Sequence, residues 1–207
     1  MDEEILQENL TVPVLGFNVP IEVYDFFRTA GIVLVLCILV YIFIATPNQV
    51  EGDSMIPTLS NKDLIITDRV SQWMGNILKD STFSYERGDI IVFQKPGFKD
   101  FVKRIVGLPG ERISIHNGRV FINEVELTED YIYQDSTMGG NFITNDGQEI
   151  LVPENRYFVL GDNRIDSLDS RYEDIGLINR DWIKGKVLLR YWPLTVFNVF
   201  ENPMYNI

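Results

Sequence analysis

Two different hydrophobic patterns divide this chain. Residues 29–46 carry no charged side chain and are apolar on every face of a helix, whereas the residues after Pro47 form short apolar runs between polar turns. At about 1.5 Å per residue, the first segment spans about 27 Å, close to the thickness of a bilayer core. The pattern predicts a transmembrane helix over 29–46. A buried helix of a soluble protein is the alternative, and the absence of a polar face disfavours it.

The flanks of this segment indicate an uncleaved anchor with a defined orientation. Residues 1–28 are acidic and carry Pro13, Gly16 and Pro20, which predicts a loosely ordered tail. Large side chains precede Ala45, where a signal-peptide cleavage site would need small ones. Arg28 lies on the amino-terminal side, and no Lys or Arg follows until Lys62. The positive-inside rule therefore places the tail in the cytoplasm and residues 47–207 outside.

The second pattern is typical of an all-β domain. Seven runs are rich in β-branched or aromatic residues and are bounded by Gly, Pro, Asn or Asp. Asn117-Gly118 separates two of them and predicts a tight hairpin. Residues 123–151 are more polar and predict an inserted, smaller β extension. The runs are 64–66, 89–93, 101–106, 112–115, 120–122, 156–160 and 186–190.

Composition narrows the function classes. The formal net charge is −12 and the pI is about 4.5, which disfavours nucleic acid as a partner because phosphate binding needs clustered Lys and Arg. The single cysteine, Cys37, cannot form an intramolecular disulfide. With one Cys and one His, a Cys/His zinc site is excluded, and we expect no metal and no cofactor. His116 lies in the predicted hairpin turn, which makes it a poor base for a serine triad.

Two residues remain as candidates for acyl-transfer chemistry. Ser54 follows Gly52 and precedes Pro57, so the backbone turns there, and an ordinary turn serine is the alternative. Lys103 lies in a strand-like run, on one face with Phe101, while Arg104 occupies the other face. A lysine that is desolvated among apolar groups can act as a neutral base for a serine. The pattern leaves open whether Lys103 or Arg104 points inward.

Three polar or apolar segments have more than one interpretation. The loop 161–171 combines two Arg, three Asp and two Ser, and it is either solvated or fixed by Arg–Asp hydrogen bonds. Two apolar segments either belong to the core or rest on a membrane surface. One lies within 70–85 and contains Trp73, Met74, Ile77 and Leu78; the other contains Val196, Phe197, Val199 and Phe200.

Four motifs together resemble those of bacterial type I signal peptidases, in the same order along the chain. They are Gly52-Asp53-Ser54-Met55-Ile56-Pro57-Thr58, Arg87-Gly88-Asp89-Ile90-Ile91-Val92-Phe93, Lys103-Arg104-Ile105-Val106-Gly107-Leu108-Pro109-Gly110-Glu111, and Gly161-Asp162-Asn163-Arg164 with Ser167, Asp169, Ser170 and Arg171. The resemblance extends from the apolar segment to Trp192-Pro193. It implies a mainly β fold, with one amino-terminal transmembrane helix and a β-rich catalytic domain that carries a smaller extension.

The resemblance also implies roles for individual residues. Ser54 would be the nucleophile, Lys103 the general base, and Ser167 the residue that orients the lysine. The Ser54 N–H and a donor near Gly52 would form the oxyanion hole, although some members have a serine at the Gly52 position. Asp162, Arg164, Asp169 and Arg171 would support the site. The pockets for two small substrate residues would be lined by Val50, Met55, Leu59, Val92, Phe101 and Val102.

The implied function is removal of signal peptides from exported preproteins, after a small-x-small motif such as Ala-x-Ala. We expect a monomer in the bacterial plasma membrane whose partners are preproteins and the lipid bilayer. Ser54 lies seven residues after Pro47, at most about 25 Å of extended chain, so the site would lie near the bilayer surface. Trp73, Met74, Ile77 and Leu78 would form a loop that contacts the membrane.

Three other functions remain as alternatives. A self-cleaving Ser-Lys regulator is disfavoured by the apolar anchor and by the lack of a basic DNA-binding part. A processing complex of the secretory-membrane type, with histidine in place of the lysine, is disfavoured because Lys103 stands at the family position. A membrane-anchored β domain that only binds a partner would not contain an activated serine.

Overall fold

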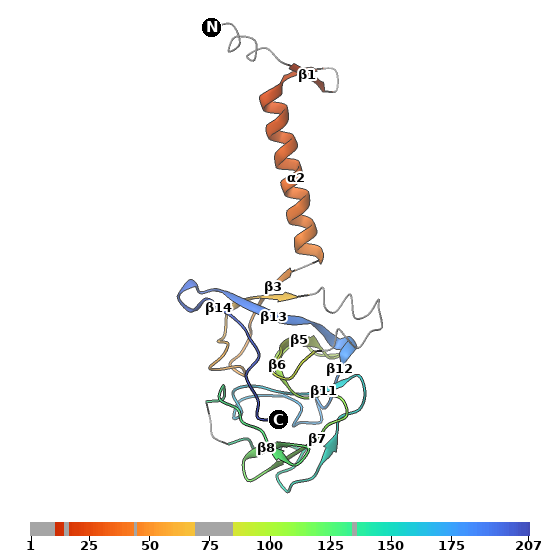
Figure 1. Ribbon diagram of the computed structural model, residues 1–207, viewed down its shortest axis with the longest axis vertical. Helices are drawn as coiled ribbons and strands as arrows, with labels where there is room; N and C mark the ends of the chain where they lie inside the picture. The colour runs from red at the N-terminus through yellow and green to blue at the C-terminus, as the bar shows by residue number, and fades with distance from the viewer. Residues whose placement is uncertain (1–10, 15–16, 44, 69–84, 134–135) are drawn as a thin grey trace. The chain divides into compact units, whose positions relative to one another are not determined.

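The computed structural model describes residues 11–14, 17–43, 45–68, 85–133 and 136–207 (Figure 1). The chain forms two compact units, Met1–Ile44 and Ala45–Ile207, and each is described by itself. The predicted loop of Trp73, Met74, Ile77 and Leu78 lies outside the described residues.

The first unit consists of a hairpin and one helix. Strands β1 (Thr11–Val14) and β2 (Phe17–Pro20) pair antiparallel, and α2 runs over Ile21–Phe43. The apolar side chains of α2 are largely exposed, among them Leu34 and Leu36. Among the described residues, no helix combines the length and the apolar character needed to cross a membrane.

The helix boundaries differ from the prediction over 29–46. The helix begins at Ile21 because Pro20 precedes it, Glu22 suits its first turn, and none of the next residues breaks a helix. A charged residue ends an apolar segment but does not end a helix, so the hydropathy pattern did not indicate that the helix begins at Ile21. The expectation of a loosely ordered tail is therefore wrong for residues 11–14 and 17–28. At the other end, Ala45–Gln49 forms strand β3.

The second unit contains one large and one small antiparallel sheet. The large sheet has the order β12-β11-β6-β5-β13-β4-β3, with β14 also paired to β13. Its remaining strands are β4 (Leu64–Asp68), β5 (Ile90–Gln94), β6 (Asp100–Gly107), β11 (Arg156–Leu160), β12 (Ile178–Asn179), β13 (Ile183–Trp192) and β14 (Asn198–Val199). Two 3₁₀ turns, Arg180–Trp182 and Leu194–Val196, flank β13.

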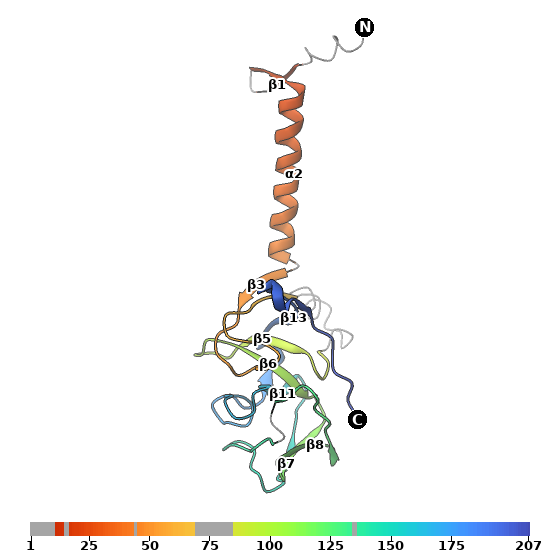
Figure 2. The same cartoon turned by 90° about the vertical axis from the view of Figure 1, so that its left-hand side faces the viewer.

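The small sheet has the order β10-β7-β8-β9, and Figures 1 and 2 both place β7 and β8 at the end of this unit opposite to β3 and β13. Its strands are β7 (Arg112–His116), β8 (Arg119–Ile122), β9 (Val125–Glu126) and β10 (Ile150–Leu151). Asn117 and Gly118 both have positive φ, 52° and 73°, as a two-residue hairpin turn requires. The extension therefore starts at Arg112 and includes more than the predicted insertion 123–151.

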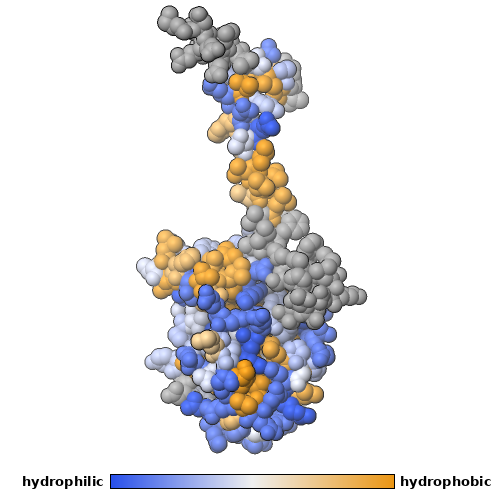
Figure 3. Space-filling view, in the orientation of Figure 1, coloured by the Kyte–Doolittle hydropathy of each residue, from blue (hydrophilic) through white to orange (hydrophobic). Residues whose placement is uncertain are grey.

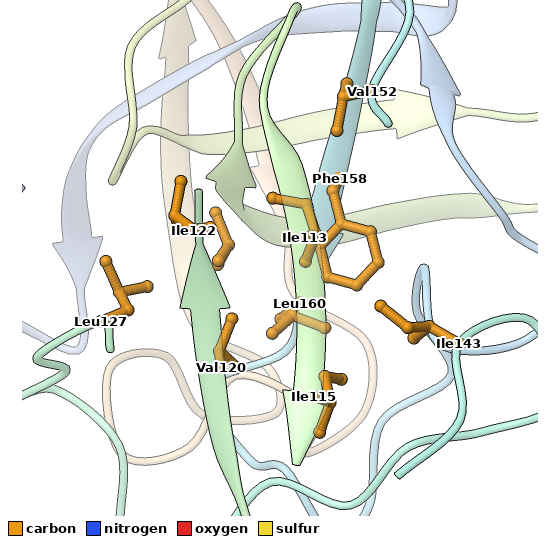
Figure 4. Packing of buried hydrophobic residues seen from close by; sticks show 10 residues of the cluster. Ile113, Ile115, Val120, Ile122, Leu127, Ile143, Val152, Phe158 and Leu160 are labelled. Atoms are coloured by element: carbon orange, nitrogen blue, oxygen red, sulfur yellow. The ribbon is translucent and has the colours of Figure 1, made fainter. Parts of the chain in front are cut away.

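All seven runs predicted as strands lie in strands, and the mainly β fold is confirmed. Their buried faces form three apolar clusters. One cluster lies between the two sheets: Ile113, Ile115 and Val120 of the small sheet pack against Phe158 and Leu160 of β11 (Figure 4). This packing joins the extension to β11, and the strand leads directly into the polar loop that starts at Gly161.

Candidate active site

A groove of about 940 Å³ runs along one side of the large sheet. One wall is the segment 48–55, which joins β3 to the turn before β4, and the other is formed by β5, β6 and the turn between them. Its lining residues are Asn48, Gln49, Val50, Glu51, Gly52, Asp53, Ser54, Met55, Val92, Gln94, Phe98, Lys99, Asp100, Phe101, Val102, Lys103, Asp166 and Leu168. Ser54 and Lys103 thus face the same groove.

Ser54 lies in a tight turn that presents its side chain to the groove. Gly52 has a φ of +88°, a conformation that favours glycine, and Ile56 N–H donates to the Asp53 carbonyl at 3.2 Å. The Ser54 carbonyl accepts a bond of 3.0 Å from Asn163 N–H. These hydrogen bonds fix the turn around Ser54, so Ser54 is not an unconstrained turn residue.

Lys103 lies in β6, paired with Ile91 of β5, and is 3% exposed. Its amine donates to Ser54 Oγ at 2.6 Å and to the Val102 carbonyl at 3.0 Å. Burial lowers the pKa of Lys103 from 10.5 to about 8, against the opposing effect of the Asp169 and Asp162 carboxylates. A substantial fraction of the amine is therefore neutral at mildly alkaline pH.

The sequence left open whether Lys103 or Arg104 points inward, and in the structure both side chains are buried. Lys103 turns toward Ser54, and Arg104, also 3% exposed, turns to the opposite face. There Arg104 binds Asp162 through two hydrogen bonds of 2.9 and 2.7 Å and donates to the Gly88 carbonyl at 2.9 Å. Lys103 and Arg104 are both buried although they lie on opposite faces of β6, an interior strand between β5 and β11.

The predicted supporting residues of the loop 161–171 are buried, whereas Ile165 and Leu168 of the same loop are exposed. Asp162, Arg164, Asp169 and Arg171 are each at most 3% exposed. Arg171 pairs with Asp169, whose carboxylate also accepts the Gly161 N–H at 3.0 Å. Arg164 pairs instead with Glu129, and Asp162 pairs with Arg104. Asp169 and Arg171 pair with each other, and both lie within the sequence motif of this loop. The partners of Asp162 and Arg164 are Arg104 and Glu129, which lie far from the loop in the chain, so the motif did not indicate these two pairs.

Ser167 does not form the expected hydrogen bond with Lys103. Its hydroxyl is buried and has no hydrogen-bond partner among the described residues. It lies against Gly161, where an added Cβ would come within 2.2 Å of Ser167 Oγ and 2.5 Å of the Ser54 carbonyl oxygen. Only glycine fits between the two serines. The orienting role of Ser167 stays a prediction.

The two predicted oxyanion donors differ in availability. The Gly52 N–H donates to Asn61 Oδ1 at 3.3 Å, so an oxyanion would have to displace that amide oxygen. Among the described residues, the Ser54 N–H donates to no other backbone group. The Ser54 N–H is thus the better candidate donor, and the roles of Ser54 and Gly52 stay predictions.

Five of the six predicted pocket residues line the groove, namely Val50, Met55, Val92, Phe101 and Val102. Leu59 does not. It is fully buried and packs in the core with Met55 and Ile65. A hydrophobic pattern cannot separate a residue that faces a groove from one that lies just beneath it. Sequence reasoning missed the polar lining, such as Asn48, Gln49 and Gln94, which carries no motif.

The remaining candidates lie outside the groove. His116 stacks on Phe121, with the ring centroids 3.8 Å apart, and does not line the groove. In the part of the chain that the structure describes, no group of three or more His, Cys, Asp or Glu side chains could hold a metal ion.

Comparisons with known proteins agree with this geometry. Residues 23–192 match the family model described as "Signal peptidase, peptidase S26". The chain is 32% identical to signal peptidase IB of Staphylococcus aureus (strain MRSA252) over 193 residues, 88% of this chain and 96% of that protein. It is 33% identical to signal peptidase I S of Bacillus subtilis (strain 168) over 175 residues, 83% of this chain and 90% of that protein.

A solved structure of a signal peptidase I from Enterococcus faecalis is 34% identical and covers 50% of this chain and 96% of its own, with a TM-score of 0.41. The family assignment rests on the two sequence matches and on the family model. The chain therefore belongs to the signal peptidase family, peptidase S26, whose serine endopeptidases remove signal peptides.

Proposed function

We propose that this signal peptidase cleaves preproteins with Ser54 as the nucleophile and Lys103 as the general base. The observation that carries the proposal is the 2.6 Å contact between Ser54 Oγ and a lysine amine that is 3% exposed. Burial lowers the pKa of this amine to about 8, so more of it is in the neutral form that can accept a proton. No histidine is needed, and the only one in the chain lies outside the groove.

The reaction follows from this contact. Ser54 Oγ attacks the carbonyl carbon of the scissile bond while its proton passes to Lys103 Nζ. The Ser54 N–H stabilises the negative oxygen of the tetrahedral intermediate. The protonated lysine then gives its proton to the leaving amine, and an ester joins the substrate to Ser54. A water, deprotonated by Lys103, hydrolyses the ester and frees the serine.

The substrate is a preprotein with small residues before the cut, such as Ala-x-Ala. The apolar part of the groove supports this preference: Val50, Met55, Val92 and Val102 leave shallow apolar space beside Ser54, which suits small side chains and provides no partner for a charge.

The family is membrane-associated, and we propose a single membrane anchor over 29–46 with the amino terminus in the cytoplasm and the catalytic unit outside, working as a monomer. Apolar side chains that stay exposed on α2 support the anchor. A second apolar surface supports contact with lipid. It comprises Trp192, Leu194, Val196, Phe197 and Val199, each 43–70% exposed, over β13 and β14 (Figure 3).

The decisive experiment measures cleavage of an Ala-x-Ala preprotein and labelling by a serine-reactive acylating inhibitor. Ser54→Ala and Lys103→Met should each abolish cleavage, and the double variant should be no worse than either, because residues that act as a unit give non-additive losses. Ser60→Ala and Lys62→Met, both at exposed positions of the same segment, should cleave normally.

Two results would contradict the proposal. Cleavage by Ser54→Ala would remove the serine from the reaction, and near-normal cleavage by Lys103→Met would remove the lysine. A folded protein that the inhibitor never labels would instead favour the binding module, which needs no activated hydroxyl.

A further inference from the structure

Arg104 and Arg164 support the 161–164 loop, and both are linked to one side chain outside the family motifs, Tyr131. Tyr131 lies in the polar segment between β9 and β10, and its ring covers the Arg104 guanidinium, whose carbon is 4.1 Å from the ring centroid. The Tyr131 hydroxyl donates to Glu129 Oε1 at 2.6 Å. Glu129 in turn pairs with Arg164. One residue of the extension thus contacts both support systems.

Each support system ends at the backbone beside the nucleophile. Arg104 holds the Asp162 carboxylate, and Arg164 donates to the Gly161 carbonyl at 3.0 Å. Gly161 lies against the Ser54 carbonyl, and the next residue but one, Asn163, donates to that same oxygen. A shift of either arginine would therefore move the loop that holds the Ser54 turn.

The carboxy-terminal segment fixes Tyr131 from the other side. Tyr205 meets the Tyr131 ring edge to face, with the centroids 6.3 Å apart. The Tyr205 ring also lies over Gly88, where an added Cβ would come within 3.1 Å of it. Gly88 is the residue whose carbonyl accepts a bond from Arg104. Asn206 ties the segment to Thr128 and Glu126 by bonds of 2.9 and 2.8 Å.

We propose that Tyr131 is a positioning residue for the Ser54–Lys103 reaction, which covers Arg104 with its ring and anchors Glu129 with its hydroxyl so that the 161–164 loop keeps Ser54 and Lys103 in place. This inference rests on the proposed dyad. Tyr131 does not line the groove, so its effect falls on the rate of the chemical step and not on substrate binding.

The proposal gives a specific pH signature. The groups whose charges act on Lys103 are Asp162, Asp166, Asp169 and Arg171, and the Ser54 hydroxyl contacts its amine. Arg104 neutralises Asp162 at present. If Arg104 loses the ring that covers it and moves, Asp162 acts on Lys103 with less compensation, and the pKa of the lysine rises. Burial raises the pKa of Tyr131 itself well above its ordinary value, so the tyrosine does not titrate in the working range.

The test compares kcat, KM and the pH dependence of kcat/KM for the full chain in detergent. Tyr131→Leu removes ring and hydroxyl and should lower kcat about tenfold, with KM nearly unchanged, because a desolvated cation–π contact is lost. Its pH midpoint should move up by about half a unit. Tyr131→Phe keeps the ring and should keep the midpoint. Tyr133→Leu is the matched control, because Tyr133 is 77% exposed in the same segment, and it should behave as the unchanged chain.

A folded Tyr131→Leu with normal kcat, or with a lower kcat at an unchanged midpoint, would overturn the inference, because general destabilisation lowers kcat without moving the midpoint. If Tyr131→Leu does not fold, Tyr205→Leu decides: a smaller upward shift supports the proposal, and no shift refutes it. Failure of the dyad itself would be seen separately, as cleavage by Ser54→Ala.

Discussion

In the proposed dyad, the buried amine of Lys103 takes the place that a histidine has in a serine triad. Desolvation by burial disfavours its ammonium form. Asp169 and Asp162 favour that form, and Arg171 opposes them. The pKa of about 8 is the balance of these effects, so only part of the amine is neutral near pH 7.

The first prediction at this scale concerns pH. With the neutral amine of Lys103 as the proposed base, kcat/KM should rise with pH and level off above a midpoint near 8, well below the 10.5 of a free lysine. Raising the pH removes the proton from the Lys103 amine, so kcat/KM should increase. Initial rates on an Ala-x-Ala peptide between pH 6 and 10 measure this. A flat profile would contradict a titrating amine, and Lys103→Arg should be inactive at every pH because its guanidinium keeps its proton.

Individual residues were predictable where local chemistry marks them. Gly52 and Pro57 mark the turn at Ser54, and the two-residue period places Lys103 beside Phe101. Leu59, named as a pocket residue by the family resemblance, lies in the core instead of lining the groove. Tyr131 and Glu129 could not be found, because their partners Arg104 and Arg164 approach them only after the two sheets have packed together.

At the scale of elements, β6 is the strand that connects chemistry to support. One face carries Lys103 to the groove, and the next residue, Arg104, reaches the opposite face and ties β6 to the loop after β11. The strand can serve both purposes because successive side chains of a β-strand point to opposite faces of the sheet. Its regular pairing with β5, from Ile90↔Arg104 to Gln94↔Asp100, sets the register that brings Lys103 to Ser54.

The buried ion pair on this strand gives the second prediction. Arg104→Leu leaves the Asp162 carboxylate uncompensated at 0% exposure, and the free energy of unfolding should fall by about 3 kcal/mol or more. Replacing both residues, as Arg104→Leu with Asp162→Leu, should recover part of that loss because no charge stays buried alone. Urea unfolding of the four proteins of this double-mutant cycle measures the coupling. Strictly additive losses would show that the pair contributes little.

The strands were predictable as elements, and the reason is their length. Runs of three or more residues, rich in β-branched or aromatic side chains, gave β4 to β8, β11 and β13. The strands β9, β10, β12 and β14 have two residues each, which is too few for a periodic signal. The register of the sheets and the start of α2 at Ile21 depend on contacts and on capping, which hydropathy does not report.

At the scale of the whole molecule, net charge and exposed apolar surface have opposite effects on contact with a membrane. Residues 45–207 carry 24 Asp and Glu against 17 Lys and Arg, a net charge of −7, which disfavours attraction to anionic headgroups, so adhesion of the catalytic unit would depend on apolar contact. The exposed residues over β13 and β14 offer such contact. Trp192 suits the interface because its ring is apolar and its N–H can stay hydrated.

The last prediction tests this surface with a chain that begins at Ala45, where the second compact unit starts. The shortened protein should cleave short peptides but lose much of its activity on membrane-inserted preproteins, because it no longer shares their two-dimensional diffusion. It should still adhere weakly to zwitterionic vesicles. Trp192→Ser with Phe197→Ser should weaken that adhesion, whereas Tyr133→Ser with Leu151→Ser, also exposed but away from β13 and β14, should not.

Vesicle co-sedimentation separates the two candidate contact surfaces. Trp73→Ser with Ile77→Ser examines the other loop, whose residues lie outside the described part of the chain, and additive losses would assign contact to both. Equal adhesion of the Trp192 and Phe197 variant and its control would show that the apolar surface over β13 and β14 does not meet lipid. In that case the preference for inserted substrates would have to come from the proposed anchor over 29–46, which would hold the enzyme at the depth of the scissile bond.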